Sequence, residues 1–344
     1  MIKYGIIGTG GIARTHADIS NNLSEVNLYG AYDIDYRNLE NFCSKYNTNS
    51  FKDINKLLAE IDVAIICSPN FCHVEHIIKS LENNCDVLCE KPLTISLEEA
   101  NILKNYKEKN FNIKAINLNY RNLTVVKKIT ELLEENRIGE IISVQMSFLK
   151  NSAIKRKYFT WRDNGKSNLS SGALGDLGIH LLDLSTFITK SHVKNETIKT
   201  KMMTKVKIKG ESEVQVDDHS ETFYMTNSGK HIHIETSKVS DESICGFYIN
   251  IIGCNGELKY SSRKSNLITI DTGTRKDIDL KGRKYKDPQS EFYGWKDSFY
   301  FTHKNLLKAI KERNNDLIPS FQDGLRAQEL LEYCTRNHSL RKPV

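Results

Sequence analysis

Proline is scarce in this chain of 344 residues, at five, and long apolar runs are missing. Together with 19 glycines, so few prolines exclude collagen-like and proline-rich disordered classes. No run reaches the roughly 18 uncharged apolar residues that a membrane-spanning helix needs. The apolar start at residues 2–7 meets glycines at once, so we expect a first strand there rather than a signal peptide.

The eight cysteines lack the pairing that disulfide frameworks and zinc sites need. No two of them are spaced as C-x-x-C, and no Cys and His spacing recurs, which disfavours a structural zinc site. Several lie in apolar runs, among them Cys67 and Cys89, where a thiol behaves as a small hydrophobe. We therefore expect reduced cysteines, a cytoplasmic protein and no bound metal.

The chain also lacks a large excess of charge of one sign, because 49 basic and 43 acidic residues leave a net charge of only +6. The densest basic run, Lys155-Arg156-Lys157, is short and is typical of a solvated loop. Nucleic-acid binding would need a clustered basic face or a known module, so we expect no nucleic-acid partner and no membrane partner. An anionic small substrate is compatible with this charge.

Short apolar runs alternate with helical patterns over the first 120 residues. Near-continuous apolar strands separated by helices indicate a parallel sheet covered on both faces, and right-handed crossovers then give a doubly wound α/β topology. The expected strands span residues 2–7, 27–32, 63–67, 86–89 and 113–118. The expected helices span residues 12–22, 36–46, 71–83 and 97–109.

After residue 120 the rhythm changes to β-branched alternation, which predicts a mostly antiparallel sheet with one face free for association. At about 150 residues per domain, the length suits two domains. We expect them over residues 1–120 and 121–344, with the last helices able to pack back on the first domain. The expected helices span residues 123–135, 177–188, 295–312 and 322–337, and the strands 141–148, 200–208, 220–225, 231–238, 248–252 and 267–271.

A glycine-rich turn, Gly8-Thr9-Gly10-Gly11-Ile12-Ala13, directly follows the first expected strand. The first glycine permits a tight turn, the second lets a pyrophosphate approach the backbone, and a small sixth residue lets the helix lie close on the sheet. The helix N-terminus adds unpaired N–H groups for phosphate. An ordinary strand-to-helix turn is the alternative. The residues predicted to bind a dinucleotide are Gly8, Gly10, Gly11, Ile12 and Ala13.

The second expected strand ends at Asp33, about 20 residues beyond the glycine turn. A carboxylate there would accept hydrogen bonds from the adenosine ribose diol and repel a 2′-phosphate. NAD is therefore predicted in preference to NADP, although Arg37 lies close enough to keep NADP open. A plain loop carboxylate is the alternative for Asp33.

Two further segments follow expected strands at the carboxyl edge of the sheet, where ligands bind in such folds. One runs from Ser68 to His73 and the other is Glu90-Lys91-Pro92. His73 and His76 lie three apart, but no third ligand is placed, so a metal pair is not expected. For Lys91 a solvated strand-end lysine is the alternative. The residues predicted to contact the cofactor here are Ser68, Asn70, His73, Glu90 and Lys91.

A glycine-interrupted apolar helix places Asp176 and His180 four residues apart, on one helical face. Glycines lower helix propensity, so their presence indicates close approach by another group, with a satisfied core histidine as the alternative. Upstream, the ring of Trp161 could pack on a sugar while Arg162 binds hydroxyls, a carboxylate or a phosphate. A packed loop with a surface arginine is the alternative there.

In order and spacing, these motifs resemble those of the Gfo/Idh/MocA oxidoreductase family, which includes glucose–fructose oxidoreductase and inositol dehydrogenase. The resemblance rests on residues 8–13, Ser68-Pro69-Asn70-x-x-His73, Glu90-Lys91-Pro92, Asp176-x-x-x-His180 and residues 319–324. It implies an N-terminal Rossmann domain, and a C-terminal α/β domain whose large open sheet assembles homodimers or homotetramers. It also implies NAD(P)-dependent hydride transfer between nicotinamide and a secondary hydroxyl of a sugar, amino sugar, nucleotide sugar or cyclitol.

The resemblance further implies that Lys91, Asp176 and His180 form the catalytic set. Histidine exchanges a proton near neutral pH, so His180 is ranked first as the base, while the Lys91 ammonium would stabilise alkoxide charge. Tyr120 and Arg121 would lie near the substrate, and Ser171 and Gly175 depart from the family pattern, which leaves the pocket shape open. Two other functions stay open: NAD-assisted glycoside hydrolysis, and a non-catalytic nicotinamide-binding regulator.

Overall fold

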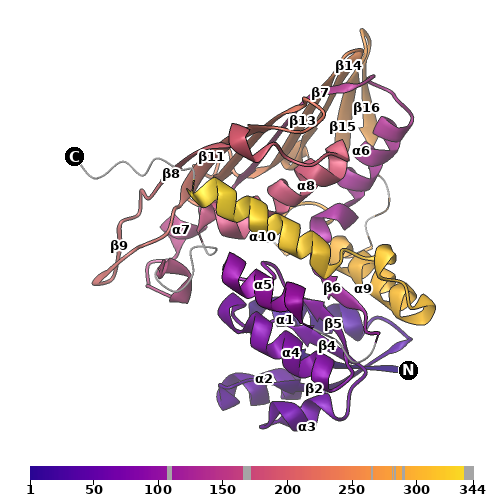
Figure 1. Cartoon of the computed structure of the whole chain (residues 1–344), viewed down its shortest axis with the longest axis vertical. Coiled ribbons are helices and arrows are strands. Elements are labelled where there is room, and N and C mark those ends of the chain that lie inside the picture. Colours follow the sequence, from indigo (N-terminus) through magenta and orange to yellow (C-terminus); the bar gives the residue numbers. More distant parts are fainter. Residues whose placement is uncertain are drawn as a thin grey trace. The chain divides into compact units, whose positions relative to one another are not determined.

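The structure, a computed structural model, describes residues 1–106, 111–165, 172–264, 266–280, 282, 284–288 and 291–336. The chain forms two compact units (Figure 1). The first contains Met1–Asn119 and Phe299–Gln328, and the second contains Tyr120–Ser298 and the residues from Glu329. Ser171 and the ends of the helices predicted to reach residues 109 and 337 lie outside the described residues.

The first unit is built on a six-stranded sheet in the order β3-β2-β1-β4-β5-β6. All neighbouring strands are parallel, which confirms the predicted doubly wound sheet. The strand order reverses between β1 and β4, and ligands bind at such a switch point in open α/β sheets. The strands are β1 (Ile2–Ile7), β2 (Val26–Tyr32), β3 (Asn49–Phe51), β4 (Val63–Ile66), β5 (Asp86–Cys89) and β6 (Lys114–Ile116).

The helices within the Met1–Asn119 part of this unit follow the predicted alternation. They are α1 (Gly11–Ser20), α2 (Tyr36–Tyr46), α3 (Ile54–Leu58), α4 (His73–Glu82) and α5 (Leu97–Asn105). The Asp35 side chain caps α2 by accepting from the backbone N–H groups of Arg37 and Asn38. The sequence did not predict β3 or α3, because both are short and β3 is a largely exposed edge strand without an apolar run.

Burial explains why the central strands were predictable. The four residues of β4 are fully buried, as are those of the apolar core of β5, because helices cover both faces of the sheet. Ile7, Ile66, Val87 and Ile77 belong to one continuous core cluster that joins the strands to α4. The carboxyl ends of β1, β4 and β5 are therefore held rigidly.

The second unit contains an eight-stranded sheet in the order β16-β15-β14-β13-β7-β12-β11-β8. β7 runs parallel to β12 and the other neighbouring pairs are antiparallel, which confirms the predicted mostly antiparallel sheet. The strands are β7 (Ile141–Leu149), β8 (Lys199–Met203), β11 (His219–Met225), β12 (His231–Ser237), β13 (Gly246–Gly253), β14 (Gly256–Ser261), β15 (Leu267–Asp271) and β16 (Arg275–Asp279).

The strand predicted over residues 200–208 is wrong at its end, because β8 stops at Met203. The Asp218 carboxylate accepts from the backbone N–H groups of Lys205 and Val206, which turns the chain out of the sheet. The chain then forms a small hairpin of β9 (Ile208–Lys209) and β10 (Ser212–Glu213). The sequence pattern also did not predict β14 and β16.

One face of the eight-stranded sheet is covered, and Figure 1 shows helix α8 (Ile179–Thr189) along it. Residues 144, 146 and 148 of β7 are buried on this side, while residues 143, 145 and 147 alternate to the other. Large apolar side chains on that other face, Phe223 and Ile252, are exposed. The further helices are α6 (Thr124–Glu134), α7 (Ser152–Lys155), α9 (Trp295–Glu312) and α10 (Phe321–Arg336).

Candidate functional site

The glycine turn between β1 and α1 is closed by Gly8. Gly8 has φ +88°, and a Cβ there would lie 2.6 Å from the backbone nitrogen of Ser68 at the end of β4. Its N–H donates to the Tyr32 carbonyl at 2.8 Å. Only glycine satisfies both the dihedral angle and this close approach, so Gly8 fixes the turn against the two neighbouring strand ends.

Gly10 and Gly11 differ from Gly8, because a Cβ at either position would meet no protein atom within 4 Å. Packing within the chain therefore does not require glycine there, whereas a ligand that approaches the backbone does. The two residues lie at the start of α1, whose first N–H groups lack side-chain caps. Ala13, two residues on, is fully buried against the sheet. The cradle fits the pyrophosphate of a dinucleotide.

Asp33 follows β2 and turns its carboxylate toward the glycine turn. Its Oδ2 accepts from the backbone N–H and the hydroxyl of Thr9, both at 2.7 Å, and its Oδ1 accepts from the Asp35 N–H at 2.9 Å. The carboxylate therefore orders the turn from the position predicted for ribose binding. Arg37 lies in the first turn of α2 and is exposed.

His73 joins the two strand-end segments that follow β4 and β5. Its Nδ1 lies 2.8 Å from the Pro92 carbonyl and its Nε2 lies 3.0 Å from the Ser68 carbonyl. Burial lowers the pKa of His73, although both carbonyl contacts oppose the shift. Asn70 is buried at the start of the intervening turn, Asn70–Cys72. The structure thus brings the predicted residues Ser68, Asn70 and His73 together at the carboxyl edge of the sheet.

Glu90 and Lys91 end β5 at the same edge. The Glu90 carboxylate is buried and accepts from the Asn117 side chain at 2.6 Å and from the Lys91 N–H at 3.2 Å. Its Oε1 also lies 2.9 Å from Nε2 of His16. The peptide bond between Lys91 and Pro92 is cis, and the Lys91 side chain is half-buried. Glu90 is thus a structural anchor directly before Lys91.

In the second unit, His180 begins a buried stack of rings. Its imidazole lies parallel to the Tyr120 ring, with centroids 3.8 Å apart and 9° between the planes. Tyr120 in turn contacts Phe292 edge-on and Phe148 in a tilted arrangement. Both His180 and Tyr120 are nearly fully buried. The orientation of the His180 ring is therefore fixed by Tyr120, which the sequence suggested only as a substrate contact.

Arg121 binds Asp183, which lies on α8, the helix that also carries His180. Its guanidinium donates two hydrogen bonds to Asp183, at 2.9 Å and 2.5 Å, and the carboxylate is buried. Such a bidentate pair has a defined geometry. Phe187 lies beneath the guanidinium at 5.0 Å. The structure therefore gives Arg121 an anchoring contact to α8.

Asp176 lies in a π-helical turn, Leu174–Gly178, which leads directly into α8. Turns of this kind occur frequently at functional sites. Its carboxylate forms an ion pair with Lys238, at 3.0 Å, at the end of β12. The sequence analysis missed Lys238, because a single lysine after a strand carries no local signal that separates it from a surface lysine.

Trp161 and Arg162 lie in a short turn, Trp161–Asp163, and the Arg162 guanidinium stacks on the Trp161 ring at 4.4 Å. Arg162 lines a small pocket that Lys238 also lines, so this pocket and the Asp176 pair share one neighbourhood. Asp163 is buried beneath it and pairs with Lys209 and Arg156. The sequence predicted a solvated loop for Arg156, which instead pairs with a buried carboxylate, and it did not single out Lys209.

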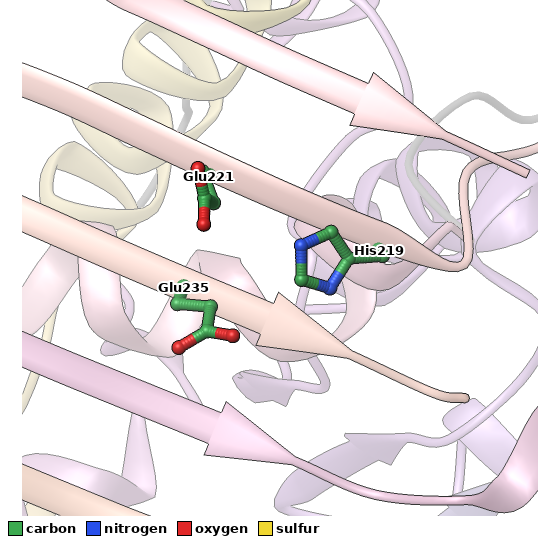
Figure 2. Close-up of side chains that lie close together, drawn as sticks. All are labelled: His219, Glu221 and Glu235. Carbon is green, nitrogen blue, oxygen red and sulfur yellow. The ribbon is translucent and has the colours of Figure 1, made fainter. Parts of the chain in front are cut away.

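Within the described part of the chain, three side chains on β11 and β12 have the spacing of metal ligands (Figure 2). The ligand atoms of His219, Glu221 and Glu235 all lie within 4.8 Å of one another, on the face of the sheet opposite α8. Glu221 faces Glu235 on one side and Lys201 on the other. Because Lys201 can neutralise these half-exposed carboxylates, we assign them no metal.

Comparison with known proteins decides the family. Residues 2–117 match the model of an oxidoreductase family with an NAD-binding Rossmann fold, and residues 130–344 match the model of its C-terminal alpha/beta domain. The chain belongs to the Gfo/Idh/MocA oxidoreductase family. The resemblance drawn from the motifs is thereby confirmed, together with the NAD-binding Rossmann domain.

Relatives in this family include sugar and cyclitol dehydrogenases. Glucose-6-phosphate 3-dehydrogenase of Bacillus subtilis is 40% identical over 100% of this chain and 98% of its own length. Inositol 2-dehydrogenase of Rhizobium meliloti is 21% identical over 100% of this chain and 98% of its own. The two alignments each span both family domains.

Among solved structures, that of levoglucosan dehydrogenase in complex with NADH matches with a TM-score of 0.87 and 20% identity, over 98% of this chain and 96% of its own. That similarity establishes the shared fold. Across the described helices, none has both the length and the apolar character needed to cross a membrane.

Proposed function

We propose that this Gfo/Idh/MocA protein is an NAD-dependent dehydrogenase that oxidises a secondary hydroxyl of a phosphorylated sugar. The observation that carries the substrate class is the 40% identity with glucose-6-phosphate 3-dehydrogenase over the whole chain. The open space over Gly10 and Gly11 supports the cofactor, because it lets a pyrophosphate approach the backbone closely. Asp33 favours NAD over NADP for the electrostatic reason given above.

When bound, NAD supplies the carbon that accepts the hydride. The pyrophosphate of NAD would be held by Gly8, Gly10, Gly11, Ile12 and the first turn of α1. The adenosine ribose would be held by Asp33. Ser68, Asn70, His73 and Glu90 would shape the wall beside the nicotinamide. The residues of this chain would then hold the cofactor in place and remove the proton of the substrate hydroxyl.

Lys91, His180 and Asp176 would manage that proton. A ring nitrogen of His180 accepts the hydroxyl proton, while the Lys91 ammonium donates a hydrogen bond to the oxygen as negative charge develops. Tyr120 supports this role, because its stacked ring prevents the His180 imidazole from rotating. Asp176, paired with Lys238, would accept a hydrogen bond from a neighbouring sugar hydroxyl.

Arg162 would bind the phosphate, with the Trp161 ring packed on the C–H face of the sugar. The pocket that Arg162 lines also contains Arg156, Lys209 and Lys238. Three of these four cations pair with the buried Asp163 or with the partly exposed Asp176. A planar guanidinium suits bidentate phosphate binding. Tyr120 and Arg121 would complete the substrate side through the contacts that hold α8.

The test is a panel of sugars with NAD and, separately, with NADP. We expect reduced nicotinamide to form with D-glucose 6-phosphate and NAD, and at a rate at least about 100-fold lower with D-glucose, because the charged contact between the Arg162 guanidinium and the phosphate is lost. Release of sugar from a glycoside without accumulation of reduced cofactor would instead support the NAD-assisted hydrolase. Cofactor binding in calorimetry without any turnover would support the regulator.

The same proposal includes a cytoplasmic homodimer or homotetramer that acts on a small molecule and binds neither nucleic acid nor membrane. The exposed apolar side chains on the open face of the eight-stranded sheet support self-association, since such patches mark interaction surfaces.

A further inference from the structure

Four polar side chains meet in the interior of the first unit, from segments far apart in the sequence. His16 lies in α1, Glu90 after β5, Asn117 after β6 and His303 in α9. His16, Asn117 and His303 are 0% exposed and Glu90 is 7% exposed. Buried polar groups cost stability unless they are hydrogen-bonded, so the pattern of bonds among them is informative.

The Glu90 carboxylate is the centre of this group. Its Oε1 accepts from Asn117 at 2.6 Å and lies 2.9 Å from Nε2 of His16, while its Oε2 accepts from the Lys91 N–H. Burial alone would raise the pKa of Glu90, but hydrogen bonds from His16 and Asn117 and the charges nearby lower it below its ordinary value. The carboxylate is therefore ionised and fixed on both oxygens.

His303 stands behind His16, with its Nε2 2.9 Å from Nδ1 of His16. An ionised carboxylate only accepts, so the proton of His16 facing Glu90 is on Nε2. Among the described residues, Nδ1 of His303 has no hydrogen-bond partner. A buried lone pair without a partner is tolerated better than a buried N–H without one, which places the His303 proton on Nε2.

Burial also lowers the pKa of His303 well below its ordinary value, so its ring is neutral at physiological pH. The hydrogen bonds consequently point one way, from His303 to His16 and from His16 to Glu90. Edge contact with Phe299 at 5.2 Å and a tilted contact with Tyr4 at 5.8 Å fix the two imidazole rings.

Folding alone does not call for this arrangement, because apolar side chains of similar volume would pack in the same space at equal or better stability. The hydrogen-bonded series from His303 through His16 to Glu90 instead fixes the orientation of each side chain. Its last acceptor, the Glu90 carboxylate, is bonded to the backbone N–H of Lys91. We propose that His16 and His303 are positioning residues for Lys91, acting through the Glu90 carboxylate. This inference rests on the proposed function, in which Lys91 contacts the reacting oxygen.

The experiment compares two variants of His303 in the full-length protein. In His303→Gln the amide nitrogen replaces Nε2 and keeps the donor, whereas His303→Leu removes it. Leu306→Ala, one turn further along α9 and also fully buried, is the matched control for lost packing. Displacement of a reacting group by about 1 Å costs on the order of 100-fold in rate.

We expect His303→Leu to lower kcat by 10- to 100-fold with little change in the KM for NAD. His303→Gln should restore kcat to within about threefold of the parent, and Leu306→Ala should lose stability but keep kcat. If His303→Leu and Leu306→Ala retain the same kcat, or if His303→Gln is as slow as His303→Leu, the positioning role is wrong.

A spectroscopic readout separates this inference from the proposed function. In 15N-histidine NMR, the parent should show His303 and His16 each with the proton on Nε2 and with Nδ1 unprotonated, each signal assigned by its loss in His303→Gln or His16→Gln. The spectrum reports the tautomers whatever substrate the enzyme uses. A His303 signal protonated on Nδ1 would overturn the hydrogen-bond direction even if sugar oxidation is confirmed, and the expected tautomers in a protein without turnover would contradict only the proposed function.

Discussion

Single residues carry the proposed proton chemistry, and Lys91 and His180 are its two centres. We expect Lys91→Met and His180→Asn each to lower kcat by about 100-fold or more, since each removes a group that acts in the transition state. The affinity for NAD should stay within about threefold for His180→Asn, because this residue is assigned to the proton and not to the cofactor. Stopped-flow kinetics and calorimetry measure the two quantities.

Lys79→Met, at a partly exposed position of α4, is the control for loss of a positive charge. Its ion pair with Glu75 lies on the surface, so it should leave both kinetics and cofactor affinity unchanged. Near-normal turnover in both Lys91→Met and His180→Asn would remove the catalytic assignment.

At the scale of single residues, the sequence predicted contacts only between residues that are close together both in sequence and in space. The positions of the turn from Gly8 to Ala13 and of the strand-end residues 68–73 and 90–92 were predictable from the expected strands, because a strand followed by a turn fixes where their backbone lies. His16 and His303 form a contact across 287 positions, and nothing in either helix signals it. Lys238 was missed for the same reason.

Two glycines in the turn between β1 and α1 have different roles. Gly8 is required by the fold of the turn, whereas Gly10 leaves space above the backbone. Gly8→Ala should destabilise the protein by about 1–3 kcal/mol or more, because alanine is strained at positive φ and meets the Ser68 backbone. Gly10→Ala has free space around it and should keep its Tm within about 2 °C of the parent. Calorimetric scans provide both values.

Gly10→Ala, which should keep its stability, should nevertheless lose affinity for NAD. Gly10→Ala puts a methyl group into the proposed pyrophosphate cradle, so we expect its Kd for NAD to rise about 10-fold or more. Unchanged NAD binding in Gly10→Ala would mean that the cofactor does not lie over this turn.

The start of the helix that carries Asp176 and His180 depends on Asp217, whose carboxylate accepts from the Leu174 N–H at 2.9 Å. Burial raises the pKa of Asp217 from 3.8 to about 6, although the hydrogen bond from Leu174 and the charge of Lys238 oppose it. Between these pH values the folded protein holds a proton that the unfolded chain has released. Stability from this group is therefore full below about pH 4 and lost as the pH rises through about 6.

Asp217→Asn keeps an acceptor for Leu174 but does not titrate. Relative to this variant, the parent's free energy of unfolding should fall by roughly 3 kcal/mol between pH 4 and pH 6, and then stay level. Urea titrations across this range measure the difference. A constant difference between the two proteins would show that Asp217 does not titrate in this range.

At the scale of elements, the sequence predicted the buried strands and longer helices well, because their apolar runs match the burial that the sheets impose. It did not predict β3 and α3, which are short, and it extended β8 past Met203. The carboxylate of Asp218, not the β-branched pattern, decides where that strand ends. Exposed β16 carries no alternation strong enough to detect.

At the scale of the whole molecule we propose self-association, with the open face of the eight-stranded sheet as its surface. Phe223→Glu and Ile252→Glu place charges on exposed apolar positions of β11 and β13 and should convert the proposed homo-oligomer to a monomer. Ile34→Glu, at a position 85% exposed in the first unit, is the control and should not. Light scattering after size exclusion gives the mass, and a parent protein that is monomeric at micromolar concentration would contradict the proposed surface.

Hydride transfer from a sugar carbon is the central claim for the chain as a whole. Its most direct measurement uses D-glucose 6-phosphate carrying deuterium on C3, the position named in the 40% identical relative. With NAD as oxidant, the account predicts deuterium in the reduced nicotinamide and a keto sugar phosphate as the product. Reduced cofactor without deuterium, or sugar product without reduced cofactor, would contradict it.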